Sequence, residues 1–324
     1  MKVSERWLVH RPGVAALALV LVLVDVPAHA AGFRLFDVPA GGDGPALHGG
    51  MWSPCTEAPA EPGRAVKDCP VAGDRLPLVV ISHGRVGSIN GHQDTAVTLV
   101  EAGYVVAAIN HPGDTGTDMS RTNDLSVFIE RPTDIKRLID FMLSASPAAA
   151  KIDPERIGFF GFSRGGYTGL VLIGAEVDWA ALAPRCIGSP RPICQQILAK
   201  QYPPQLTHDP RIKAAVIADP LAIFFAPDSY AAIRIPVQLW GSETGGDGVE
   251  PQDVAKVDAN LASPHEYRVV PNSRHFAFLT PCPPEAAARK AEPCVDPPGF
   301  DRAAFHKEFD ASVLAFFRAN LGKP

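Results

Sequence analysis

The sequence is poor in concentrated positive charge and in long hydrophobic runs. Its 324 residues hold 30 Lys and Arg against 35 Asp and Glu, without a basic cluster. A nucleic-acid partner would need clustered positive charge, so the sequence argues against that class of protein. After the first thirty residues no apolar run approaches the roughly 20 residues of a membrane-spanning helix, so stable membrane insertion is not expected either. Internal repeats and low-complexity tracts are also missing.

The first thirty residues have the pattern of a secretory signal peptide. Basic residues precede the apolar run VAALALVLVLV, and Ala28 and Ala30 then form an A-x-A site. The run has 11 residues, which is too short to span a bilayer, although an uncleaved N-terminal anchor is the alternative. We therefore expect residues 1–30 to be removed, and residues 31–324 to form one domain in the periplasm or outside the cell.

The cysteines lack the C-x-x-C spacing of a zinc site, and the histidines are not clustered, which argues against the alternative of zinc binding. All six cysteines follow the predicted signal peptide, and an even number in that context is typical of disulfide bonds. They form three local couples along the chain. We therefore predict the disulfides Cys55–Cys69, Cys186–Cys194 and Cys282–Cys294.

Short apolar runs alternate with helical patterns along the chain. Continuous apolar character is typical of strands in a parallel sheet that is covered on both faces. The predicted strands are residues 76–82, 104–110, 156–161, 212–219, 236–242 and 266–271. Helices with one apolar face are predicted within residues 94–104, 131–143 and 303–321. The pattern indicates an α/β fold with a mostly parallel central sheet flanked by helices, and residues 33–60 are expected to add antiparallel strands at one edge.

Residues 175–210 interrupt this alternation. The segment is rich in proline, contains one cysteine couple and is long for a connection between a helix and a strand. We interpret it as a disulfide-stapled insertion over the C-terminal edge of the sheet. It is either a partial lid or a surface excursion without a role.

The stretch RIGFFGFSRGG places a serine between a predicted strand and a predicted helix. Gly161 and Gly165 leave room for a sharp turn at Ser163, and G-x-S-x-G in this context is the pattern of a nucleophile elbow. The turn raises the hydroxyl beside the N-terminus of the helix, whose backbone N–H groups can stabilise a developing negative charge. Ser163 is therefore the candidate nucleophile.

A serine nucleophile needs a base, and the order along the chain in this setting is serine, acid, histidine. His275 follows the last predicted strand, so its loop can return to the edge of the sheet where Ser163 projects. The other late histidines lie before a strand, in the insertion or in a helix, and they are His265, His208 and His306. His275 is the candidate base.

Three acidic residues follow strands at the same edge of the sheet and compete as the partner of the base. Asp219 ends one strand, although before Pro220 it could instead form a turn. Asp247 and Glu243 follow the next strand, and Asp247 lies in a glycine-rich stretch that could also be a plain turn. We favour Asp247 slightly and keep Asp219 as the alternative acid.

An oxyanion hole needs two backbone donors near the nucleophile. The first is the N–H of Arg164, directly after Ser163. The second is expected from the loop after the strand 76–82, where Gly84 lets the backbone turn inward and Arg85 supplies an N–H. His83 lies in the same loop. It either stabilises the loop by hydrogen bonding or acts at the site as a ligand or base.

These motifs resemble the α/β-hydrolase superfamily, and within it the dienelactone-hydrolase-like proteins and plasma-type platelet-activating-factor acetylhydrolase. Over most of residues 75–280 the resemblance rests on LVVISHG, YVVAAINHPG, GFSRGG, IADPLAIF and RHFAF. It implies a Ser-His-Asp esterase that needs no cofactor. The acetylhydrolase branch places its acid at the position of Asp219, and many other members place it at the position of Asp247. Ser163 stands where dienelactone hydrolases carry cysteine, so the resemblance does not extend to dienelactone as the substrate.

The sequence therefore predicts a carboxylic-ester hydrolase that acts on a small molecule through an acyl-enzyme on Ser163. An acyltransferase or peptidase with the same triad is one alternative, and a binding protein that keeps the fold without chemistry is another. The side chains of Arg85 and Arg164 also suggest a substrate with a carboxylate or phosphate, unless they point into solvent.

Overall fold

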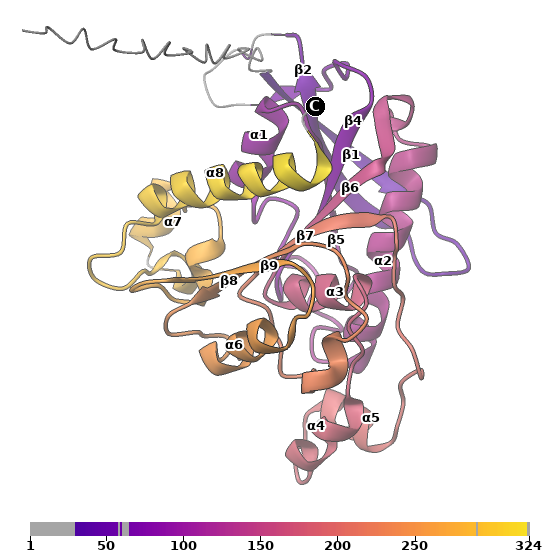
Figure 1. The fold of residues 1–324 in the computed structure, drawn as a ribbon, viewed down its shortest axis with the longest axis vertical. Helices are drawn as coiled ribbons and strands as arrows, with labels where there is room; N and C mark the ends of the chain where they lie inside the picture. The colour runs from indigo at the N-terminus through magenta and orange to yellow at the C-terminus, as the bar shows by residue number, and fades with distance from the viewer. Residues whose placement is uncertain (1–29, 58, 60–64, 290, 323–324) are drawn as a thin grey trace, which may run out of the picture.

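The computed structural model describes residues 30–57, 59, 65–289 and 291–322 (Figure 1). The predicted signal peptide lies outside the described residues, except for Ala30, which is the first residue of strand β1. In the described part of the chain, no helix combines the length and the apolar character that crossing a membrane requires.

The described strands form one mixed nine-stranded sheet in the order β3-β1-β2-β5-β4-β6-β7-β8-β9. Neighbouring strands from β5 to β9 are parallel, whereas β2 pairs antiparallel with both β1 and β5. The predicted α/β class, the mostly parallel sheet and the antiparallel edge are confirmed. The strands are β1 Ala30–Val38, β2 Leu47–Cys55, β3 Val66–Lys67, β4 Leu76–Ser82, β5 Val105–Asn110, β6 Ile152–Phe162, β7 Ile212–Ala218, β8 Val237–Ser242 and β9 His265–Val270.

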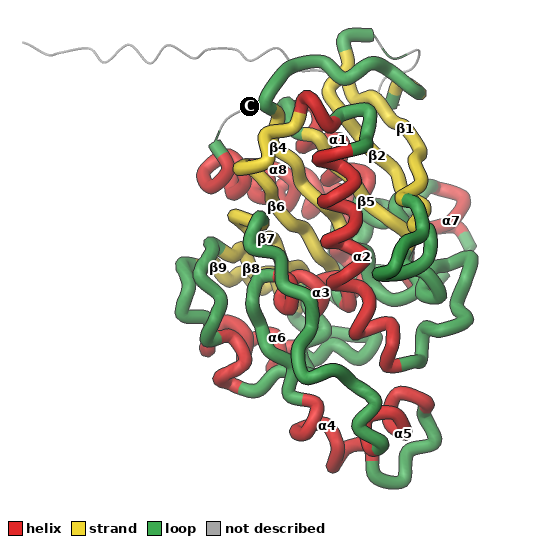
Figure 2. Tube along the Cα trace, turned by 90° about the vertical axis from the view of Figure 1, so that its right-hand side faces the viewer, coloured by secondary structure: helices red, strands yellow, loops and turns green. Residues whose placement is uncertain are grey.

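Helices cover both faces of the sheet (Figure 2). Helices α1 and α8 pack on one face, and α2, α3 and α6 pack on the other. The α-helices are α1 Gln93–Glu101, α2 Leu125–Ser144, α3 Arg164–Leu172, α4 Trp179–Cys186, α5 Pro192–Leu198, α6 Pro251–Asn260, α7 Pro284–Ala288 and α8 Arg302–Leu321. The described residues also form the short 3-10 helices η1 Ala149–Lys151, η2 Pro227–Tyr230, η3 His275–Phe278 and η4 Glu292–Cys294.

Strand β5 shows why the predicted strands lack polar alternation. Val105 and Ile109 pack into the cluster on the side of α2, whereas Val106 and Ala108 pack into the cluster under α1 and α8. Burying a valine or isoleucine side chain contributes roughly 1.5–3 kcal/mol, so a strand that is apolar on both faces anchors both layers. The sheet is thus a firm base for the loops at the carboxyl ends of its strands.

The three predicted disulfides are present, and in the described residues every cysteine is paired. Residues 175–210 form α4 and α5, which the second disulfide joins. The two helices lie at the foot of the molecule in Figure 1. They pack on α2 and α3 through an aromatic cluster that includes Trp179 and Tyr167.

Candidate active site

Ser163 lies in the turn between β6 and α3 with φ 57° and ψ −117°, a conformation that costs a serine about 1–3 kcal/mol. The flanking glycines make this turn possible. A Cβ atom on Gly165 would lie 1.9 Å from the carbonyl oxygen of Ser82, and one on Gly161 would lie 2.3 Å from the oxygen of Gly165. The Ser163 N–H donates to the oxygen of Ala218 at 3.0 Å, which holds the serine at the carboxyl end of β6.

His275 begins η3, and its Nε2 lies 2.9 Å from Ser163 Oγ. This distance is within reach of proton transfer. The imidazole ring stacks on the Phe162 ring with a centroid distance of 4.6 Å. The backbone N–H of His275 donates to the carbonyl oxygen of Gly245 at 2.9 Å. The imidazole is only 1% exposed, so its orientation is fixed from both sides.

Asp219 directly follows β7 and is fully buried. Its Oδ2 lies 2.7 Å from His275 Nδ1, and it also accepts a hydrogen bond from Ser242 Oγ at 2.7 Å. Its Oδ1 accepts from the Ser242 N–H at 2.8 Å. Because the carboxylate accepts from Nδ1–H, the Nε2 of His275 is left as the acceptor for the serine hydroxyl. Ser242, which the sequence reasoning missed, holds the carboxylate toward the imidazole.

Asp247 occupies a different place from the one expected of the favoured acid. Its carboxylate accepts two hydrogen bonds from Arg85, at 3.1 Å from Nε and 2.7 Å from a terminal nitrogen, and within the described chain it forms none with His275. The two glycines before Asp247 lengthen the loop and carry it past the histidine. The structure therefore reverses the slight preference for Asp247, since Asp219 is the carboxylate that faces the imidazole.

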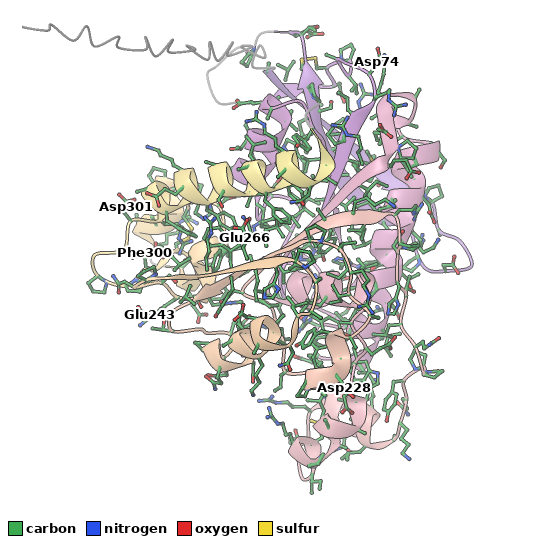
Figure 3. All side chains as sticks on the ribbon, viewed as in Figure 1. Asp74, Asp228, Glu243, Glu266, Phe300 and Asp301 are labelled. Carbon is green, nitrogen blue, oxygen red and sulfur yellow. A yellow bond between two sulfur atoms is a disulfide. The ribbon has the colours of Figure 1, made fainter. Side chains whose placement is uncertain are left out.

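Glu243, the third acidic candidate, lies on the loop after β8 (Figure 3). Its carboxylate accepts a hydrogen bond from the backbone N–H of Asn272 at 2.6 Å. Glu243 is exposed, and this hydrogen bond to Asn272 holds the loop before His275. Within the described chain, its carboxylate makes no hydrogen bond with the imidazole.

The two predicted oxyanion donors remain available. Among the backbone hydrogen bonds of the described residues, the N–H groups of Arg85 and Arg164 donate none. By contrast, the N–H of Val86 donates to the carboxylate of Asp114 at 3.3 Å. A Cβ atom on Gly84 would lie 3.2 Å from Ser163 Cβ, so the loop after β4 passes directly beside the serine. An oxyanion formed next to Ser163 Oγ would have the backbone N–H groups of Arg85 and Arg164 as hydrogen-bond donors.

The side chain of Arg164 is buried beneath this site and does not extend into solvent. Its guanidinium donates to Asp114 Oδ2 at 2.8 Å and lies 4.6 Å from the centroid of the Phe128 ring. Although burial alone would raise it, Arg131 and Arg164 hold the pKa of Asp114 below its usual range. Arg164 is paired with Asp114 and Arg85 with Asp247, so a carboxylate balances the positive charge of each arginine.

His83 braces the oxyanion loop from below. Burial lowers its pKa well below the ordinary value, with a further contribution from the charge of Arg131. Its Nε2 accepts a hydrogen bond from the N–H of His111 at 3.2 Å, and its Nδ1 lies 2.7 Å from the carbonyl oxygen of Gly84. These contacts favour the interpretation of His83 as a brace over the alternatives of ligand or base.

Two neighbouring hollows lie at the candidate triad and share lining residues. A pocket of about 100 Å³ holds Ser163 between the oxyanion loop, Phe276 and Pro293. A cleft of about 660 Å³ adjoins it and shares Asp247, His275 and Phe276. No described residue of 175–210 lines either hollow. The covering segment is instead 291–297, which carries Cys294 of the third disulfide, and the sequence analysis missed it although this cysteine couple closely follows His275.

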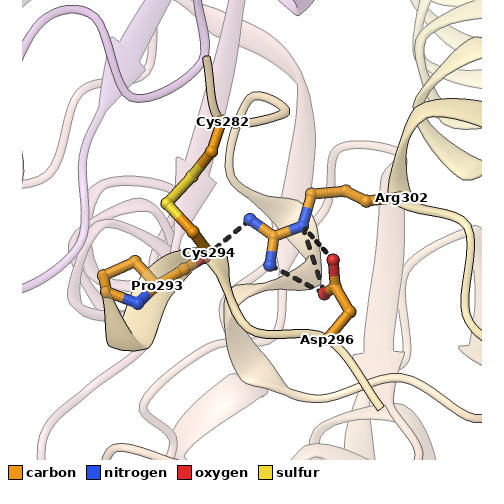
Figure 4. The surroundings of a disulfide bond; sticks show 5 residues. All are labelled: Cys282, Pro293, Cys294, Asp296 and Arg302. Atoms are coloured by element: carbon orange, nitrogen blue, oxygen red, sulfur yellow. Dashed lines mark hydrogen bonds and ion pairs between the residues drawn. A yellow bond between two sulfur atoms is a disulfide. The ribbon is translucent and has the colours of Figure 1, made fainter. Parts of the chain in front are cut away.

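Arg302, the first residue of α8, fixes this covering segment (Figure 4). One terminal nitrogen donates to the carbonyl oxygen of Pro293 at 2.7 Å, and the other donates to Asp296 Oδ1 at 2.7 Å. The Cys282–Cys294 disulfide closes the loop on its other side. Hydrogen bonds from Arg302 and one disulfide therefore hold the segment that covers the serine in place.

No family model matches the chain, and no curated protein matches it either. The fold, a mixed sheet with helices on both faces, is of the α/β class. A solved structure with this fold, the ferulic acid esterase from Streptomyces cinnamoneus, is similar to the chain with a TM-score of 0.59 and 20% identity, and the match covers 92% of both chains. At this level of identity the likeness shows the fold alone.

Proposed function

We propose that the protein is a secreted or periplasmic serine hydrolase that cleaves carboxylic esters through an acyl-enzyme on Ser163. The observation that carries this proposal is the pair of hydrogen-bond distances around His275. Its Nε2 lies 2.9 Å from Ser163 Oγ, and its Nδ1 lies 2.7 Å from Asp219 Oδ2. The name of the similar structure, an esterase, supports the same reaction class. Three disulfides fit an oxidising compartment.

The reaction follows from the roles that the geometry allows. His275 takes the proton of Ser163 Oγ while that oxygen attacks the ester carbonyl carbon. The N–H groups of Arg85 and Arg164 stabilise the tetrahedral oxyanion, and losing one such donor typically costs about 10²–10³ in rate. His275 then gives its proton to the alcohol oxygen as the carbon–oxygen bond breaks. Water, deprotonated by His275, attacks the acyl-enzyme, and the acid leaves with Ser163 restored.

Within the superfamily, the position of the acid favours the acetylhydrolase-like arrangement. In that branch the carboxylate follows the strand that corresponds to β7, which is where Asp219 lies. The proposal therefore assigns the chain to this side of the resemblance, with Asp219 as the residue that stabilises the imidazolium during the reaction.

Hydrolysis of p-nitrophenyl esters and labelling by a fluorophosphonate test the proposal together. Wild type should be labelled on Ser163 and should turn over the esters, whereas Ser163→Ala should take no label and lose at least about 10³ in kcat. Ser144→Ala, which changes an exposed serine at the end of α2, is the matched control. An unlabelled wild type, or a Ser163→Ala variant with full activity, would contradict the proposal. Assays with a peptide and with an added alcohol acceptor would reveal a peptidase or an acyltransferase.

A further inference from the structure

The alcohol part of an ester must lie on the His275 side of Ser163, if the proposed function is correct. His275 Nε2 gives its proton to the leaving oxygen, which therefore lies within hydrogen-bond reach of the imidazole. The cleft of about 660 Å³ lies next to this position, because His275 and Phe276 line both the cleft and the pocket that holds Ser163. The cleft is therefore the place for the alcohol, and the smaller pocket holds the reacting carbonyl and the acyl group.

The two hollows differ in size. The pocket at Ser163 has a volume of about 100 Å³, which is below the roughly 300–1,000 Å³ of sites that hold whole small molecules. The cleft, at about 660 Å³, is in the range of sites that hold whole small molecules. A short acyl group and a larger alcohol fit this division of space.

Two charged side chains line the cleft with their hydrogen-bonding groups unused. Arg274 and Glu292 are exposed, and neither forms a hydrogen bond or an ion pair through its side chain with another residue of the described chain. Asn272 lines the same cleft and uses its amide nitrogen to donate to the carbonyl oxygen of Pro298 at 3.0 Å, which leaves its amide oxygen as an acceptor. The cleft thus offers both donors and acceptors to a ligand.

The charges around the cleft balance. Arg85 is paired with Asp247, and Arg274 is matched by Glu292, so the cleft favours neither a cationic nor an anionic alcohol. A neutral molecule with several hydroxyl groups can donate to Glu292 and accept from Arg274 at the same time. Apolar faces for the C–H groups of such a molecule come from Phe276, Val295 and Pro297.

We propose that this cleft binds a neutral, hydroxyl-rich alcohol of the saccharide class, so that the preferred substrates are saccharides esterified with short acyl groups. The proposal rests on the function proposed above and adds the leaving group to it. It also gives the loop held by the Cys282–Cys294 disulfide a role, because this loop carries Glu292.

A comparison of two esters on the wild-type protein tests the idea directly. The esters are 6-O-acetylglucose and cyclohexylmethyl acetate, which share the acyl group and a six-membered ring but differ in hydroxyl groups. We expect kcat/KM to be at least about tenfold higher for the glucose ester, mainly through KM, since hydrogen bonds to charged groups are the strong ones. Equal or faster hydrolysis of the cyclohexylmethyl ester would overturn the proposal, and so would a preference for acetylcholine.

Variants locate the preference in the cleft. Arg274→Ala and Glu292→Ala should each lower the ratio of the two kcat/KM values about tenfold. The matched controls Arg289→Ala and Glu285→Ala change exposed residues in or next to α7, outside the cleft, and should leave the ratio unchanged. If Ser163 takes the fluorophosphonate label and p-nitrophenyl acetate is hydrolysed without a preference for the saccharide, this inference fails while the proposed function stands. If no ester is hydrolysed and no label is taken, both fail.

Discussion

Replacing Asp219 by asparagine should disable the base while keeping the shape of the site. The asparagine oxygen can still accept from the Ser242 N–H, now at 2.8 Å from Oδ1. Its NH₂ group would then replace Oδ2 and point at His275 Nδ1, at present 2.7 Å away. An N–H donor at that position forces Nδ1 to be the acceptor, so the ring hydrogen moves to Nε2. In this tautomer His275 cannot take the proton of Ser163.

The same change in a known serine protease lowers kcat by about 10⁴, which corresponds to about 5 kcal/mol in the activation free energy. We expect a loss of this order for Asp219→Asn with p-nitrophenyl acetate. The matched variant is Asp247→Asn, which weakens a pair whose arginine side chain is 43% exposed. Such a pair contributes about 0–1 kcal/mol, so kcat should fall by less than about tenfold.

The assay is steady-state kinetics on both variants, with thermal unfolding as the check that each one is folded. The reasoning would be refuted by folded Asp219→Asn that retains activity within tenfold of wild type. It would equally be refuted if Asp247→Asn lost several orders of magnitude, because the carboxylate that orients His275 would then be the wrong one.

Three further predictions concern the elements around the site. Gly165→Ala should abolish folding or activity, because its Cβ would lie 1.9 Å from the oxygen of Ser82, and soluble expression with esterase assays checks this. Arg302→Met should lower stability by about 1.5–3 kcal/mol and raise KM, since the segment over the serine loses its hydrogen bonds, as urea unfolding and kinetics would show. Burial, with a contribution from Asp94, raises the pKa of Asp310 from 3.8 to about 7. The folded state therefore binds this proton more tightly, and stability should fall as pH rises from about 4 to about 7. Asp310→Asn, which can still accept from Thr95, should flatten that dependence in urea unfolding between pH 5 and 8.

The strands and the position of the nucleophile could be predicted because local sequence determines them. The run at 104–110 had to be buried on both faces, and the structure places it as β5 between two helical layers. Gly161 and Gly165 likewise predict a tight turn at Ser163, because a larger residue at either position would clash with the backbone. The cysteine couples were predictable for the same reason, since each pair is close in sequence.

The choice of the acid could not be predicted, because it depends on the path of two loops. Asp219 and Asp247 both follow strands at the same edge of the sheet. Asp219 lies directly after β7 and contacts His275 there, whereas Asp247 comes after two glycines on a longer loop. The covering segment was missed for a related reason, since which residues lie over Ser163 depends on the path of residues 291–297 in the folded chain.

The final position of Asp247 gives this residue a different part in the site. Arg85 supplies an expected oxyanion N–H from its backbone, and its guanidinium binds Asp247 with two hydrogen bonds. Asp247 in turn lines both the pocket and the cleft. The ion pair therefore joins the loop of the proposed oxyanion donor to a loop that lines the proposed alcohol cleft. Because a bidentate pair fixes the relative position of the two loops, an alcohol bound in the cleft contacts the same element that holds the oxyanion donor in place.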